Sequence, residues 1–255
     1  MALAALIFDV DGTLADTERD GHRVAFNRAF AEAGLDWVWG VDLYGDLLAV
    51  TGGKERMQFY LDRYRSDFRR PADMAGFLKA LHLAKTRYYV QMLEAGEIPL
   101  RIGVARLLRE ARAAGVRLAI ATTTTPENVT TLLRHALADD SVDWFEVIGA
   151  GDIVAAKKPA PDIYQWVLDK MGITAAHALA IEDSENGLRA AHAAGLRTVV
   201  TLNHYTEGQN FSDALAVFDH LGDNGHACSR VQGKVPAPVN HQVDVAWLRE
   251  AAATP

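Results

Sequence analysis

The sequence predicts an α/β fold in which a parallel sheet carries an inserted, all-helical second domain. Three observations support this prediction. Short apolar runs rich in β-branched residues alternate with stretches of helical periodicity, which is typical of parallel sheets covered on both faces. The first run ends in two acids one residue apart, Asp9 and Asp11, followed by Gly12. The stretch from about residue 17 to 96 breaks the alternation with several helices and no clear strand.

Six runs read as strands because each is short, apolar and followed by a turn signal or a helical stretch. In chain order they are Leu3–Phe8, Val116–Thr122, Phe145–Ala150, Ala178–Ile181, Thr198–Leu202 and the weaker Ala216–Phe218.

The helices between these strands show apolar residues at helical spacing and end at glycines. Val104, Leu107 and Leu108 share one face of a helix that Gly115 ends. Similar stretches end at Gly172 and at Gly195, and Ser184 is a good N-cap for the second.

The inserted region has amphipathic stretches at Val24–Ala33, Arg56–Tyr64 and Phe77–Leu93. We therefore expect residues 1–16 and 97–222 to form the core, and residues 17–96 to form a cap over the carboxyl edge of its sheet. Residues 223–255 form a C-terminal extension whose role the sequence does not show.

Composition limits the class of protein. The chain has 255 residues, a formal net charge of −7 and a single cysteine, Cys228. The acidic balance argues against a nucleic-acid partner, and no apolar run reaches the ~18 residues of a membrane span. No internal disulfide can form, so we expect a cytoplasmic protein in a reducing compartment, acting as a monomer on a small molecule.

Four groups of polar residues follow the ends of predicted strands, which meet at one edge of a parallel sheet. They are Asp9 and Asp11, Thr122 with Thr123, Lys158, and Glu182 with Asp183. Each group has an ordinary explanation when taken alone: an acidic turn, a helix cap, a surface lysine and an acidic helix N-terminus. Their joint order makes a shared pocket the better interpretation.

Such a pocket suits phosphoryl transfer to a carboxylate. Asp9 is the expected nucleophile and Asp11 the acid and base. Lys158 and a divalent cation, expected to be Mg²⁺, would neutralise the phosphate, and Thr122 would hydrogen-bond its oxygens. The candidate metal ligands, from side chains or a backbone carbonyl, are Asp9, Asp11, Glu182 and Asp183.

These motifs resemble the four motifs of the haloacid dehalogenase superfamily of phosphatases. The resemblance rests on Asp9-Val10-Asp11-Gly12-Thr13, Thr122, Lys158-Pro159 and Glu182-Asp183. It implies a Rossmann-like core with a mobile helical cap, and Mg²⁺ held by Asp9, the Asp11 carbonyl and Asp183. Dehalogenases proper lack an acid at the position of Asp11, so the chain is expected to be a phosphatase.

The cap resembles the CbbY branch of this superfamily, through Asp16-Thr17-Glu18, Tyr44 and Thr51-Gly52-Gly53-Lys54-Glu55-Arg56. Glycine amides beside two cations also suit a second anionic group, although a glycine turn before a solvated helix would look the same. The resemblance implies a Calvin-cycle phosphatase that converts xylulose 1,5-bisphosphate, an inhibitor of Rubisco, to xylulose 5-phosphate. The implied substrate contacts are Glu18, His22, Tyr44, Gly52, Gly53, Lys54, Arg56 and Thr123. Between Glu18 and His22 this chain has one residue more than the branch usually shows.

Two other functions remain open on the sequence. One is a phosphosugar mutase of the β-phosphoglucomutase type, whose close relatives carry a histidine four residues after the threonine that matches Thr17. This chain has Gly21 there, which favours hydrolysis. The other is a non-catalytic phosphate-binding regulatory protein, which would usually lack one of the acids present here.

Overall fold

In the computed structural model, residues 3–50 and 52–254 are described, and they form two compact units. One unit comprises Met1–Asp16 with Pro99–Pro255, and the other is Thr17–Ile98. The first is the α/β core and the second the helical cap. Residues 223–255, which the sequence analysis set apart as an extension, belong to the core unit. In the part of the chain that the structure describes, no helix is long and apolar enough to cross a membrane.

The core is built on a seven-stranded sheet with the strand order β3-β2-β1-β4-β5-β6-β7. The first six strands are parallel, and β7 pairs antiparallel with β6. Their bounds are Ala5–Phe8 (β1), Arg117–Ala121 (β2), Phe145–Gly149 (β3), Ala178–Glu182 (β4), Arg197–Thr201 (β5), Ala216–Phe218 (β6) and Arg230–Gly233 (β7). All six predicted strands are present, and β7 was not predicted, because its four residues are exposed and show no apolar alternation.

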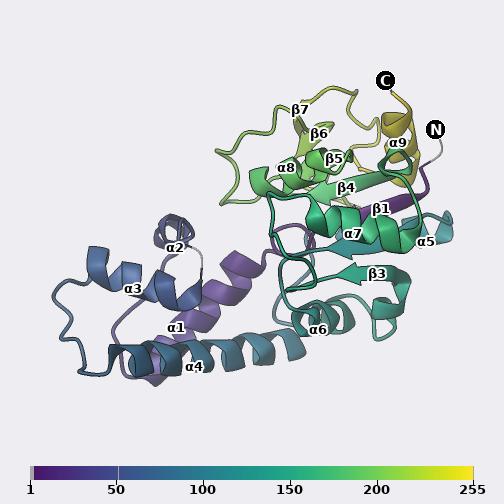
Figure 1. Cartoon of the computed structure of the whole chain (residues 1–255). Helices are drawn as coiled ribbons and strands as arrows, with labels where there is room; N and C mark the ends of the chain where they lie inside the picture. The colour runs from purple at the N-terminus through teal and green to yellow at the C-terminus, as the bar shows by residue number, and fades with distance from the viewer. Residues whose placement is uncertain (1–2, 51, 255) are drawn as a thin grey trace. The chain divides into compact units, whose positions relative to one another are not determined.

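Helices cover both faces of this sheet (Figure 1). Ala5 and Ile7 of β1 pack in one cluster with apolar residues of α7 and α8. Because successive strand residues point to opposite faces, Leu6 and Phe8, which are fully buried, face the other side, where a second layer covers them. The core helices are α5 (Val104–Ala113), α6 (Pro126–Ala136), α7 (Asp162–Met171), α8 (Glu185–Ala193) and α9 (Val245–Ala253), with short 3-10 turns at Ser141–Trp144 and Ala175–His177.

Hydrogen bonds from α5 hold the C-terminal segment, residues 223–255, against the rest of the core. Arg106 of α5 donates hydrogen bonds to the carbonyls of Leu221, Gly222 and Val243, at 3.0 Å each. Glu110, one turn later, accepts from the backbone N–H of Val245 at the start of α9. The segment thus completes the core with β7 and α9.

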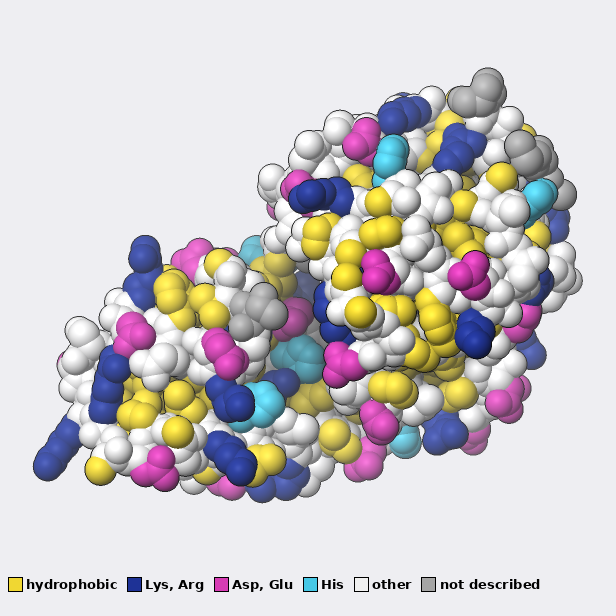
Figure 2. Space-filling view, in the orientation of Figure 1, with side chains coloured by type: hydrophobic (Ala, Val, Ile, Leu, Met, Phe, Trp, Pro, Cys, Tyr) yellow, Lys and Arg dark blue, Asp and Glu magenta, His cyan; other side chains and the backbone are white. Residues whose placement is uncertain are grey.

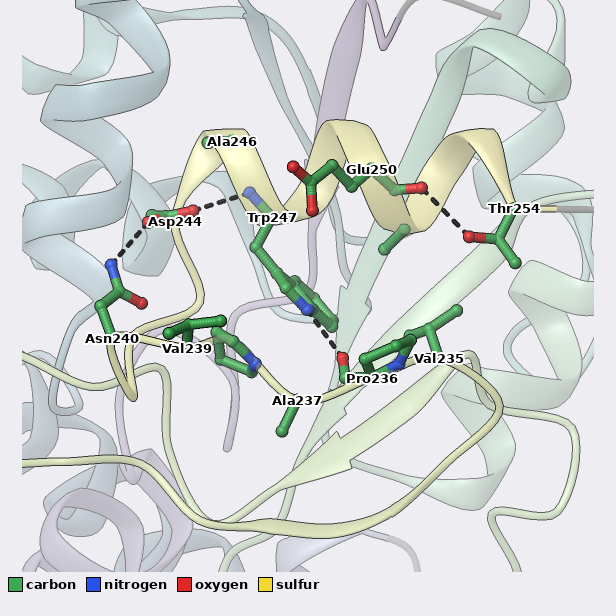
Figure 3. A pocket seen from close by; sticks show the side chains of 12 residues that line it. Val235, Pro236, Ala237, Val239, Asn240, Asp244, Ala246, Trp247, Glu250 and Thr254 are labelled. Atoms are coloured by element: carbon green, nitrogen blue, oxygen red, sulfur yellow. Dashed lines mark hydrogen bonds between the residues drawn. The ribbon is translucent and has the colours of Figure 1, made fainter.

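A groove of about 540 Å³ lies between α9 and the preceding loop of valines and prolines. Figure 3 shows Trp247 reaching from α9 to this loop, where its indole N–H donates to the Pro236 carbonyl at 2.9 Å. Asp244 caps the helix through the backbone N–H of Trp247. None of the lining residues belongs to the polar groups predicted to form a site.

The cap unit contains only helices among its described residues. They are a π-helical turn at Thr17–His22, then α1 (Arg23–Glu32), α2 (Val41–Leu47), α3 (Gly53–Tyr64) and α4 (Met74–Glu94). Its core is aromatic: the ring centroids of Phe30 and Trp37 lie 5.2 Å apart, and those of Trp39 and Tyr60 lie 5.4 Å apart. Such edge-to-face pairs suit a small helical unit, because few residues bury much apolar area.

Candidate active site

The predicted strand-end residues meet in the core unit around one buried ammonium group. The Lys158 Nζ lies 2.6 Å from Asp9 Oδ1 and 2.6 Å from Glu182 Oε1. Asp9 directly follows β1, Glu182 ends β4, and Lys158 comes from the loop between β3 and α7. The Lys158–Pro159 peptide bond is cis. Strands β1 and β4 are hydrogen-bonded neighbours, so their parallel register brings the carboxylates of Asp9 and Glu182 together.

The Glu182 carboxylate accepts hydrogen bonds from three donors. Besides Lys158, its carboxylate accepts from the Tyr164 hydroxyl at 2.6 Å and from the backbone N–H of Asp183 at 3.2 Å. It is fully buried, and a Cβ on Gly187 would lie 2.0 Å from its carboxyl carbon. These contacts favour a role in which Glu182 positions Lys158, while its predicted role as a metal ligand stays a prediction.

Asp183 is the second buried acid of the site. Its Oδ1 accepts from the Thr13 hydroxyl at 3.3 Å and its Oδ2 from the Asn203 amide at 2.6 Å. Gly12 has a φ of +90°, and a Cβ there would lie 2.2 Å from Asp183 Oδ2. The glycine is therefore required both for the turn and for the close approach of Asp183.

The electrostatics of the cluster follow from its burial. Removal from water raises the pKa of Asp9 to about 7, with Glu182 and Asp11 adding to the effect and Lys158 opposing it. Burial and the neighbouring acids also raise the pKa of Asp183. Burial alone would lower the pKa of Lys158, but Asp9 and Glu182 outweigh it and raise that pKa. Lys158 therefore stays charged.

The donor set fits a divalent cation. Carboxylate oxygens of Asp9, Glu182 and Asp183 all lie within 4.8 Å of one another, and hard cations such as Mg²⁺ prefer oxygen ligands. One lysine faces several carboxylates, so a cation would offset the burial and the repulsion that raise the pKa of Asp9 and Asp183.

The remaining predicted core residues lie beside these strands. Thr122 follows β2 and is buried, its hydroxyl accepting from the backbone N–H of Thr124 at 3.3 Å. Thr123 is exposed. Asp11 is partly buried and forms an isolated β-bridge with Ala15, within the turn that follows β1.

Several predicted cap residues form a hydrogen-bonded chain within the cap unit. Arg56 donates to the Tyr44 hydroxyl at 2.8 Å, and this hydroxyl donates to Glu18 at 2.5 Å. The Arg56 guanidinium also lies 5.2 Å from the centroid of the Tyr44 ring and 3.8 Å from Glu18. Gly52 has a φ of +96° and precedes α3, and Lys54 is exposed on the first turn of that helix. Thr51, which opens this segment in the sequence, lies outside the described residues.

His22 ends the π-helical turn and contacts a lysine that the sequence analysis missed. The Lys85 Nζ lies 2.8 Å from His22 Nδ1 and 5.0 Å from the centroid of Tyr89. The turn is π-helical, and a π turn holds more residues than an α turn, while the additional residue between Glu18 and His22 stays a prediction. Burial, Lys85 and Arg56 lower the pKa of His22, which keeps the imidazole neutral.

A further cap residue, His82, was not predicted to belong to this group. His82, one turn before Lys85 on α4, packs so closely on Gly53 that a Cβ there would lie 2.6 Å from its ring. Burial, then Lys85 and Lys54, lower the pKa of His82. The only sequence signal was a basic pair three residues apart on an amphipathic helix, which is common on solvated faces.

Charges on the surface are mixed. Figure 2 shows Lys and Arg side chains interspersed with Asp and Glu over the visible face of each unit. This face shows no basic stripe of the kind that binds nucleic acid.

The chain matches a protein family model, curated proteins and solved structures. The family model of haloacid dehalogenase-like hydrolases matches residues 3–195. The protein CbbY encoded on a plasmid of Cupriavidus necator is 48% identical over 97% of this chain and 96% of its own length. The crystal structure of CbbY from Rhodobacter sphaeroides with phosphate is 44% identical, has a TM-score of 0.71 and covers 88% of this chain and 96% of its own.

A mutant of the same Rhodobacter sphaeroides protein was solved in complex with xylulose 1,5-bisphosphate. That structure has a TM-score of 0.70 and 44% identity, covering 86% of this chain and 94% of its own. The chain therefore belongs to the haloacid dehalogenase-like hydrolase family, in its CbbY branch, and is an enzyme of the phosphatase type that its core residues predict.

Proposed function

We propose that this phosphatase hydrolyses xylulose 1,5-bisphosphate to xylulose 5-phosphate and inorganic phosphate, and thereby removes an inhibitor of Rubisco. The observation that carries the proposal is the shared Lys158 contact, 2.6 Å from both Asp9 and Glu182, in the core of a chain whose cap carries a separate cationic group. The complex of the Rhodobacter sphaeroides relative with this bisphosphate supports the choice of substrate.

The core residues would carry the reaction in two steps. Asp9 attacks phosphorus in line, so a bond forms between its carboxylate oxygen and phosphorus while the bond to the sugar oxygen breaks. Asp11 gives its proton to the departing sugar oxygen. It then takes a proton from the water that attacks the aspartyl-phosphate, and this step releases phosphate and restores Asp9.

Lys158 and Thr122 would bind the phosphate, and Thr122 would do so by hydrogen bonds to its oxygens. Lys158 is charged and lies against Asp9, so it would neutralise a phosphate that arrives beside the carboxylate. Asp9, the Asp11 carbonyl and Asp183 would hold Mg²⁺, which supplies charge neutralisation for the phosphoryl group and lets Asp9 stay ionised.

The cap residues would recognise the second phosphate and the sugar. Arg56 is held by Tyr44 and Glu18, so its remaining N–H groups are presented in a fixed direction. Lys54 and the amides after Gly52 are suited to phosphate. His22 with Lys85 offers donors for sugar hydroxyls or phosphate oxygens, which adds Lys85 to the proposed binding residues.

One observation keeps the mutase function under test. The π turn places His22, five residues after Thr17, in contact with Lys85. The mutases carry their histidine one residue earlier, four residues after the matching threonine, so the assay must separate hydrolysis from isomerisation.

The experiment is a phosphate-release assay with Mg²⁺ on xylulose 1,5-bisphosphate, other sugar bisphosphates and their monophosphates. We expect preference for bisphosphates and the highest rate for xylulose 1,5-bisphosphate. Equal rates on monophosphates would overturn the assignment of the cap. Rapid isomerisation of β-glucose 1-phosphate without phosphate release would identify a mutase, and Mg²⁺ binding without turnover on any phosphosugar would identify a regulatory protein.

A further inference from the structure

Asn203, in the loop after β5, directly contacts a predicted metal ligand. Its amide nitrogen donates to Asp183 Oδ2 at 2.6 Å, across 20 residues of sequence. No motif in the sequence marks this residue, because it stands in the segment Leu202-Asn203-His204-Tyr205 without acidic or glycine neighbours.

The loop fixes which end of the Asn203 amide faces Asp183. The backbone N–H of Tyr205 donates to Asn203 Oδ1 at 2.9 Å, so the oxygen is turned into the loop and the nitrogen outward. The Asn203 backbone N–H donates to the Thr206 hydroxyl oxygen at 3.0 Å, and the Thr206 N–H donates to the Asn203 carbonyl at 3.0 Å. The turn thus holds the side chain in one orientation.

The Asp183 carboxylate accepts one hydrogen bond from the Asn203 amide and one from the first motif. Thr13 donates to its other oxygen, and a Cβ on Gly12 would lie 2.7 Å from the Asn203 amide nitrogen, so the glycine leaves room for Asn203 to approach. With one donor on each oxygen, the carboxylate cannot rotate without losing a hydrogen bond. Its remaining lone pairs therefore point in fixed directions.

We propose that Asn203 is a positioning residue that holds the Asp183 carboxylate in the orientation that binds a divalent cation. The inference rests on the proposed function, in which Asp183 holds Mg²⁺. An amide suits this position because it donates a hydrogen bond without adding another negative charge to Asp9, Glu182 and Asp183. Residues that hydrogen-bond to a metal ligand raise the metal affinity, because they fix the orientation of the ligand before the metal binds.

The test compares Mg²⁺ affinity by titration calorimetry in the full-length wild type and in Asn203→Ala. Loss of such a partner typically weakens metal binding by about 10- to 100-fold, and we expect a loss in this range. Thr206→Val, which leaves Asn203 but loosens its turn, should show a smaller loss. The matched control is Asn210→Ala, since Asn210 also caps a turn in this loop but has no contact with Asp183.

The activity readout separates positioning from a general structural role. Asn203→Ala should recover most of its kcat for phosphate release at high Mg²⁺ concentration, whereas a damaged core would not. Unchanged Mg²⁺ affinity in a folded Asn203→Ala protein would overturn the inference. If this variant does not fold, Asn203→Ser, which keeps a small polar side chain in the turn, must show the same loss.

The two proposals can fail separately. If the wild type binds Mg²⁺ but releases no phosphate from any phosphosugar, the proposed function fails, and the affinities of the variants still decide the role of Asn203. If the wild type is an active phosphatase and Asn203→Ala binds Mg²⁺ as tightly, only the inference on Asn203 fails.

Discussion

The candidate core site and the predicted binding residues of the cap differ in charge. In the core, the carboxylates of Asp9, Glu182 and Asp183 lie around the ammonium group of Lys158, so this cluster is negative and suits a cation. In the cap, by contrast, the cationic side chains of Lys54, Arg56 and Lys85 lie near two acids, Glu18 and Glu55, so this group suits an anion.

One chain thus separates the proposed chemistry from the proposed recognition. The candidate site in the core is built at the ends of hydrogen-bonded strands, so its geometry follows from the sheet register. The proposed binding residues of the cap lie on helices and a glycine turn, where side chains can change without disturbing the sheet. Four predictions test this division, beginning with the change that should slow the reaction most.

Removal of the nucleophile should have the largest effect. Asp9→Asn keeps the size of the side chain but cannot form the aspartyl-phosphate, so phosphate release should fall by about 10⁴-fold or more. The measurement is single-turnover phosphate release. The control is retained binding of the bisphosphate, since the cap is unchanged. Full activity in this variant would refute the assignment of the core.

Removal of the central ammonium should come next. Lys158→Met leaves Asp9 and Glu182 buried without their shared donor, so kcat should fall by about 10²- to 10³-fold. Breaking a buried ion pair in this way should also cost about 3–5 kcal/mol of unfolding free energy. Denaturant unfolding measures the second effect. An exposed ion pair provides the control: Arg87→Ala, which loses Glu32, should cost less than about 1 kcal/mol.

Changes in the cap should affect recognition more than chemistry. Arg56→Ala should raise KM for the bisphosphate by about 10- to 100-fold, because a charge-assisted contact contributes about 1.5–3 kcal/mol. The rate on a monophosphate should change little. Lys54→Ala should have a smaller effect, since Lys54 is exposed and solvent screens its charge. A fall in kcat alone would mean that Arg56 takes part in the reaction, and would contradict the proposed division between a catalytic core and a recognition cap.

The last prediction concerns stability and pH without metal, and it involves no change in the catalysed reaction. The pKa of Asp9 is about 7 in the folded protein against 3.8 as its ordinary value, so the folded state binds a proton more tightly than the unfolded state. The stabilisation is complete below about pH 4 and is lost as the pH rises towards 7, by up to about 1.4 kcal/mol per pH unit.

Thermal or urea unfolding between pH 4 and 8 in EDTA measures this loss. Asp9→Asn should flatten the profile, because it removes the titrating group, and Mg²⁺ should also flatten it by replacing the proton. A profile in Asp9→Asn as steep as that of the wild type would show that other groups dominate.

The sequence predicted the core better than the cap for physical reasons. Strands β1 to β6 carry apolar runs, and their ends hold acids and a lysine that few other arrangements explain. By contrast, β7 is exposed on all four residues, and Asn203 is an ordinary loop amide, so neither has a pattern. The contact of Lys85 with His22 joins residues 63 positions apart on two amphipathic helices, and spacing alone does not predict such a contact.

The π turn at Thr17–His22 has a consequence for reading related chains. The turn ends at His22, whose imidazole contacts Lys85 of α4 across 63 residues of sequence. Counting four residues from Thr17 gives Gly21, whereas the imidazole in contact with Lys85 belongs to His22. At the entrance to this cap, equivalent side chains are better matched by their neighbours in space than by their distance along the sequence.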